Sequence, residues 1–123
     1  MTLLDAINRI QHYKPSRFTH GDFVQWVSQV ESMVKRSVID AYVGGEAITF
    51  SGFDRDTDTS TVLFMPEPFD MAYIYYMEAQ IHYFNEDIDM YNSAMMMFNS
   101  VFNEYKADYG KTHVSKLAGR FRF

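Results

Sequence analysis

The chain has 123 residues, of which 47% are hydrophobic and 22% charged, as expected for one folded domain rather than a disordered segment. Its formal net charge of −5 argues against a general nucleic-acid binder. It contains no cysteine, which excludes disulfides and thiolate chemistry. Because no apolar run approaches the roughly 18 residues needed to cross a bilayer, and the first residues lack a signal-peptide pattern, we expect a cytoplasmic protein without a membrane partner.

The first forty-five residues predict two amphipathic helices. Thr2 can cap a short first helix, and the Lys14-Pro15 pair should end it, because a residue before proline avoids helical geometry. A second helix should start between Thr19 and Asp22, either of which could be its cap, and Gly44-Gly45 should stop it. The apolar face of this second helix recurs at helical spacing, at Phe23, Val27, Val30, Val34 and Val38.

Residues 46–65 predict a long loop, within which 47–50 and 61–64 could pair as a short β-hairpin. Asp54, Asp56 and Asp58 alternate as at the start of a calcium-binding loop. The match then fails, because Thr59 stands where the sharp turn needs glycine and Met65 where a bidentate glutamate belongs. We interpret this stretch as a solvated acidic loop.

The second half predicts an antiparallel pair of helices, which makes the fold all-α with about four helices. Residues 66–68 should open the third helix, which is apolar from Phe69 to Phe84 except for a strip at Glu78 and His82. The fourth should run from about Asp87 to Tyr109 and end at Gly110. Its main apolar seam, spaced by three and four residues, comprises Ile88, Tyr91, Met95, Phe98, Phe102, Tyr105 and Tyr109.

The fourth helix also carries a second apolar stripe beside this seam. Its members are Met90, Ala94, Met97 and Val101. Two adjacent stripes can serve one wide core or a core and a partner; in a domain this small we favour the second, with homo-oligomerisation through this stripe and Tyr75. The run Met95-Met96-Met97 cannot form one patch, since successive residues point about 100° apart, and should fill irregular gaps in packing. A methionine-rich partner groove is the alternative.

The last thirteen residues contain four basic groups and no acid, so we divide the chain into a helical domain, 1–110, and a basic tail, 111–123. The alternation of arginine and phenylalanine at its end suits an extended segment that docks on a neighbour, whereas a frayed end is the simpler alternative. The residues predicted to bind a partner are Lys111, Lys116, Arg120, Phe121, Arg122 and Phe123.

The sequence contains no recognisable catalytic motif. The four histidines show no paired spacing, and the glycines form no phosphate-binding pattern. Glu78, His82 and Glu86 fall on one helical face, but di-iron bundles use a different spacing in duplicate. We therefore expect no enzyme, cofactor or metal, and keep a metal-dependent enzyme only as a remote alternative.

Residues 66–105 resemble the head–tail connector (adaptor, or head-completion) proteins of tailed bacteriophages. The resemblance lies in Pro66-x-Pro68-Phe69-Asp70, in the helix Tyr75–Ile81, and in Tyr91-Asn92 followed by Phe98-Asn99. Glu86 departs from the pattern, because similar proteins are expected to have glycine there. The resemblance implies a helical virion protein of the neck region that assembles in the bacterial host cytoplasm.

The same resemblance implies a homo-oligomeric ring, commonly of twelve copies, beneath the portal protein. Such a ring extends the DNA channel after genome packaging and offers a platform to a stopper or tail-completion protein. An acidic body would let DNA slide past without specific binding. The alternative class is a small helical interaction module, such as a phage or prophage regulator, that forms no ring.

Overall fold

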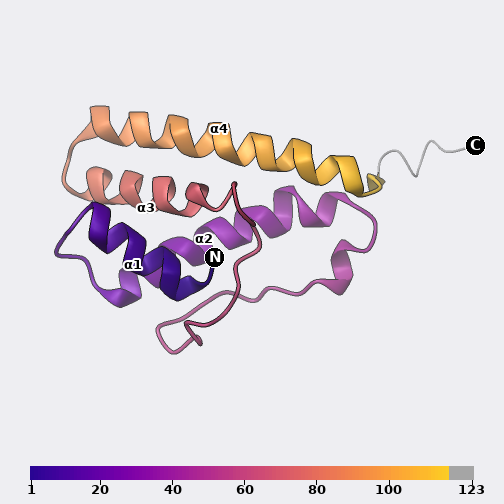
Figure 1. The fold of residues 1–123 in the computed structure, drawn as a ribbon, viewed down its shortest axis with the longest axis horizontal. Helices are drawn as coiled ribbons and strands as arrows, with labels where there is room; N and C mark the ends of the chain where they lie inside the picture. Colours follow the sequence, from indigo (N-terminus) through magenta and orange to yellow (C-terminus); the bar gives the residue numbers. More distant parts are fainter. Residues whose placement is uncertain (117–123) are drawn as a thin grey trace, which may run out of the picture.

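The computed structural model describes residues 1–116 of the chain; the predicted partner-binding residues Arg120, Phe121, Arg122 and Phe123 lie outside this range. Four helices follow one another, α1 (Leu3–Tyr13), α2 (His20–Ser37), α3 (Met71–Phe84) and α4 (Ile88–Thr112), as Figure 1 shows. Two short 3₁₀ turns, η1 (Ile39–Ala41) and η2 (Gly45–Ala47), follow α2. The predicted all-α fold with a long loop between the second and third helices is confirmed.

Reciprocal capping fixes the start of the first two helices. The Thr19 side chain accepts a hydrogen bond from the Asp22 N–H at 3.3 Å, and the Asp22 carboxylate accepts one from the Thr19 N–H at 2.9 Å. Thr2 and Asp5 make the same arrangement at the start of α1. Thr19 is therefore the cap, and Asp22 is its partner in the first turn.

The predicted stop of the second helix at Gly44-Gly45 was wrong, since α2 ends at Ser37. Beyond it, η1 turns Ile39 into the core, where it is buried. The glycines serve this connection instead: Gly44 takes a left-handed φ of 89°, and a side chain at Gly45 would overlap the Ile39 carbonyl. Lys35 donates to the Gly45 carbonyl at 3.0 Å, which fixes the turn to the end of α2.

The hairpin considered for 47–50 and 61–64 does not form, and residues 1–116 contain no strand. Residues 61–63 bond to the beginning of the chain instead: Leu3 donates to the Thr61 carbonyl at 2.9 Å, and Leu63 donates to the Met1 carbonyl at 3.0 Å. The two loop segments meet through the rings of Phe50 and Phe64, 5.8 Å apart. Tertiary pairing with distant residues replaced the local pairing.

The predicted antiparallel hairpin of α3 and α4 is confirmed, and the two helices lie side by side in Figure 1. Three aromatic pairs set its register, each seven residues from the next along both segments, with ring centroids 5.3–5.5 Å apart. They are Tyr83 with Tyr91, Tyr76 with Phe98, and Phe69 with Tyr105.

Both boundaries of this hairpin differ from the prediction in detail. The third helix starts at Met71 rather than at 66–68, after a turn over 66–70. The fourth continues through Gly110 to Thr112. Gly110 is a packing position, because an added Cβ would lie 2.7 Å from the Tyr42 hydroxyl oxygen.

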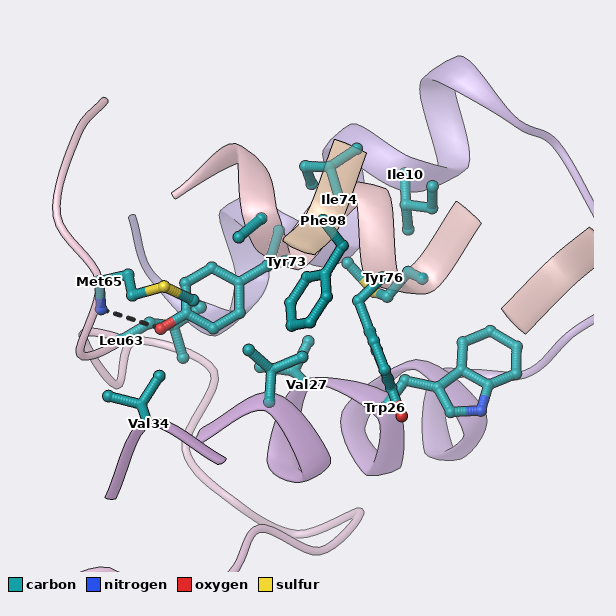
Figure 2. Close-up of a cluster of buried hydrophobic side chains, with 14 of the residues drawn as sticks. Ile10, Trp26, Val27, Val34, Leu63, Met65, Tyr73, Ile74, Tyr76 and Phe98 are labelled. Carbon is teal, nitrogen blue, oxygen red and sulfur yellow. Dashed lines mark hydrogen bonds between the residues drawn. The ribbon is translucent and has the colours of Figure 1, made fainter. Parts of the chain in front are cut away.

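All four helices and the loop contribute to one core. Figure 2 shows Ile10 of α1, Val27 and Val34 of α2, and Tyr73 of α3 converging, with Leu63 and Met65 of the loop. The third helix is covered on most sides, as its composition predicted: its partly exposed residues include Glu78 and His82, the predicted polar strip. This closed core means that the remaining exposed apolar residues are free to contact other molecules.

Candidate assembly surface

The predicted interface stripe of α4 divides into covered and free residues. Ala94 is buried, with 5% of its surface exposed, and Val101 packs partly buried against the core, as does Tyr75 of α3. Met90 and Met97 keep 42% and 47% of their surface exposed. Because these two methionines lie seven residues apart, they occupy the same side of α4.

The three consecutive methionines have different environments. Met95 packs partly buried against the core. Met96 is 71% exposed and Met97 about half exposed, so the expectation that all three fill gaps in packing was wrong for these two. Flexible, polarisable methionine side chains adapt well to a partner surface. We call Met90 and Met97 the methionine flank.

The turn between α3 and α4 is a second exposed apolar area, with acids beside it. Tyr83, Phe84 and Ile88 each expose about half of their surface. Glu86 and Asp87, also exposed, stand between them in the chain. Glu86 adopts a positive φ of 62°, the conformation in which glycine is favoured. This end of the molecule therefore combines exposed rings with negative charge.

An aromatic hollow of about 230 Å³ opens at the same end. Its apolar walls are Phe18, Trp26 and Phe84, with Trp26 in T-shaped contact with Phe18 at 5.2 Å and stacked on Phe84 at 6.1 Å. Its polar lining consists of Asp22, Gln25, Gln29 and Gln80. The sequence analysis missed this hollow, because its walls come from three separate segments and share no spacing.

At the C-terminal end of α4 the chain turns back, and residues 114–116 contact residues 42–46. The Val43 N–H donates to the Val114 carbonyl at 2.8 Å, and Tyr42 and Ser115 form an antiparallel bridge. Lys116, one of the predicted partner-binding residues, pairs with Glu46 at 3.5 Å, and Lys111 is exposed. The chain therefore remains packed on the helical body up to residue 116, six residues beyond the predicted domain boundary.

A buried carboxylate joins α2, α3 and the loop. Glu31 is 1% exposed and accepts hydrogen bonds from the Tyr73 hydroxyl and, at 2.9 Å, from the Phe64 N–H. The Tyr73 hydroxyl in turn accepts from the Met65 N–H at 2.9 Å (Figure 2). Burial raises the pKa of Glu31 to about 7, partly offset by these two hydrogen bonds.

Sequence analysis did not single out Glu31, although a signal was present. On a helical wheel it falls between Val24 and Val38, inside the apolar arc of α2. A charged residue within such an arc either lies at a functional site or has buried donors. Here the donors are the Tyr73 hydroxyl and the Phe64 N–H, so Glu31 fixes the loop to the helices.

The candidate metal ligands do not come together. Within residues 1–116 no group of three or more potential ligands is placed to hold a metal ion. Glu78 pairs with His82 at 3.5 Å and with Lys14 at 3.7 Å, whereas Glu86 stands apart in the exposed turn. Asp54 and Asp58 accept hydrogen bonds from the N–H groups two residues later, at 2.8 and 2.9 Å, which makes them turn-forming residues.

Neither a known protein family, nor a curated protein, nor a solved structure matches this chain. None of the helices in residues 1–116 has the length and apolar character of a membrane span. The exposed apolar areas and the distribution of charge are therefore the features from which a function can be argued.

Proposed function

We propose that the chain is a structural virion protein, the subunit of a head–tail connector ring beneath the portal of a tailed bacteriophage. The supporting observation is that six of the twelve exposed large apolar residues within 1–116 lie between the end of α3 and the middle of α4, outside a core that is already closed. A monomer gains nothing by exposing the methionine flank, Phe84 and Ile88 to water. Contact between neighbouring copies would cover them.

The size of this surface favours an assembly that forms only on a template. Burying a half-exposed methionine or phenylalanine contributes about 1 kcal/mol, so these four residues contribute about 4 kcal/mol. The loss of translational and rotational freedom on association costs at least as much. A pair of free copies is then weakly held. A closed ring, in which every subunit has two neighbours on a portal template, is favoured by the added contacts.

The charge distribution supports a channel through which DNA passes unbound. The body is acidic, with a net charge of −5 for the whole chain, and like charge discourages adhesion to phosphate. Lys111 is exposed, and it would contact the portal protein above or the stopper or tail-completion protein below. In this proposal the protein assembles in the host cytoplasm and resides in the virion neck.

The test compares two charge insertions on α4. Met97→Glu places a carboxylate in the methionine flank, and Asn99→Glu places one at an exposed position on the opposite side of the same helix. We expect electron microscopy of the chain mixed with the portal protein of the same phage to show rings for the native chain and Asn99→Glu. Met97→Glu should show none.

Two observations would contradict the connector function. One is a monomer or dimer at every concentration, with and without portal protein, which would favour the small interaction module. The other is absence of the chain from purified virions by mass spectrometry. Equal ring formation by Met97→Glu would show that the methionine flank is not the interface.

A further inference from the structure

The aromatic hollow is a preformed site with aromatic walls and a polar lining. Phe84, one of its walls, is about half exposed, and Gln25 at its edge is exposed. Gln29 accepts a hydrogen bond from the Tyr76 hydroxyl at 2.6 Å, which holds this amide in place. Carboxylate and amide oxygens beside aromatic rings suit a ligand that carries both cationic donors and apolar groups.

The charges around the hollow are arranged for a basic ligand. Asp22 lines it, and Glu86 and Asp87 follow directly after the Phe84 wall. The nearby cation Arg17 donates to the Asn85 side chain at 3.3 Å and covers the Phe18 ring at 5.1 Å, and it keeps its positive charge. Asp22 and Asp87 also accept backbone hydrogen bonds at the starts of α2 and α4, but three acids against one cation leave a net negative charge that attracts an incoming cation.

The chain itself supplies a segment of this chemistry. Arg120 and Arg122 alternate with Phe121 and Phe123. In an extended segment, successive side chains point to opposite sides, so two rings and two guanidinium groups would be presented on separate faces. Guanidinium groups pair with carboxylate and amide oxygens, and the phenylalanine rings match the aromatic walls.

This segment cannot reach the Phe84 wall of the hollow in its own molecule. Ser115 pairs with Tyr42, whose ring packs on Tyr109 at a centroid distance of 5.2 Å. In the aromatic register of the hairpin Phe84 lies level with Met90, and from Tyr109 back to Met90 the helix rises about 28 Å. The seven residues after Lys116 span at most about 24 Å. The Phe84 wall is therefore beyond the reach of seven residues that start at Lys116.

We infer that the Arg-Phe segment of one copy docks in the aromatic hollow of the next copy. This contact joins different surfaces of the two copies, and repeated head-to-tail contacts of this kind close into a ring or continue as a filament. The inference rests on the proposed ring and identifies what would link its subunits besides the methionine flank. Charge attraction between the two ends would also orient the approaching copies.

A peptide tests the fit of the segment. Trp26 is the only tryptophan of the chain and forms a wall of the hollow, so its emission reports occupancy. An N-acetylated peptide with the sequence of residues 117–123, titrated into the full chain, should change that emission saturably. Replacing both phenylalanines of the peptide by alanine should weaken binding at least about tenfold.

Two protein variants provide a matched control for the peptide experiment. Gln25→Lys places a cation at the edge of the hollow and should weaken the native peptide about threefold, whereas Ser100→Lys, on exposed α4 surface, should not. A peptide that binds equally well with alanine in place of phenylalanine, or produces no saturable change, would overturn the inference.

Cross-linking separates contact between copies from contact within one copy. Because the chain has no cysteine, Gln25→Cys combined with Arg122→Cys introduces one pair. Mild oxidation should give a ladder of covalent dimers, trimers and larger species on a denaturing gel. A cross-linked monomer, or a ladder no stronger than that of Ser100→Cys with Arg122→Cys, would refute head-to-tail docking.

The outcomes also distinguish this contact from the connector function. Rings without a ladder would refute the docking and leave the connector function standing. A ladder without rings in the presence of portal protein would support the docking and refute the connector function.

Discussion

The buried carboxylate of Glu31 makes folding stability depend on pH in an unusual direction. Its folded-state pKa is about 7 against 4.5 for an ordinary glutamate, so the folded chain binds a proton at pH values where the unfolded chain has lost it. The free energy of unfolding is therefore highest below about pH 4.5 and falls as the pH rises to about 7. Above that pH, both states are ionised and the contribution levels off.

The size of the effect follows from the shift. The difference of about 2.5 pKa units corresponds to about 3 kcal/mol, at about 1.4 kcal/mol per unit. Glu31→Gln stays neutral at every pH and keeps an oxygen that can accept one of the two hydrogen bonds. We expect the variant to gain about 3 kcal/mol relative to the native chain between pH 4.5 and pH 8.

Urea denaturation measures this difference, with helical circular dichroism as the signal, at half-unit steps from pH 4.5 to 8.5. Only the difference between native chain and variant is interpreted, because other groups titrate in both. Glu104→Gln, at an exposed position of α4, is the control and should leave the pH dependence unchanged. Parallel stability curves for Glu31→Gln and the native chain would refute the argument that burial controls this carboxylate.

Two further predictions concern the backbone of the hairpin. Glu86→Gly removes the strain of a side chain at a φ of 62° and should raise the free energy of unfolding by about 0.5–1 kcal/mol; an unchanged or lower urea midpoint would contradict it. Gly110→Ala should stabilise α4 by about 1 kcal/mol only when Tyr42→Phe first removes the hydroxyl that an added Cβ would meet at 2.7 Å. A double-mutant cycle with no coupling between these two positions would disprove this close contact.

The elements that the sequence predicted best are those with locally repeated spacing. The seam of α4 repeats every three and four residues, which is enough to predict a long helix and its partner. The aromatic pairs of the hairpin then follow, since residues on two antiparallel helices meet at matching intervals. The caps were also local: Thr19 and Asp22 were both recognised, and the structure assigned their roles.

The errors occurred where tertiary contacts decide local structure. Gly44-Gly45 and Gly110 were predicted to end helices because glycine commonly does so. In the structure Gly45 and Gly110 have another role, because a side chain there would overlap Ile39 and Tyr42, respectively. The loop pairing failed for the same reason, because residues 61–63 bond to the beginning of the chain. No spacing within a segment reports a contact with a residue sixty positions away.

The candidate surface shows which part of such a prediction the sequence can supply. Composition and spacing indicated more apolar surface on α4 than one helix could cover. They could not say that Ala94 and Val101 lie on the side closed by the core while Met90 and Met97 remain free. That division depends on how α4 is rotated against α3, which the aromatic register fixes. A ring contact through the methionine flank alone would be small, so a second contact at the acidic, aromatic end would add both affinity and direction to the assembly.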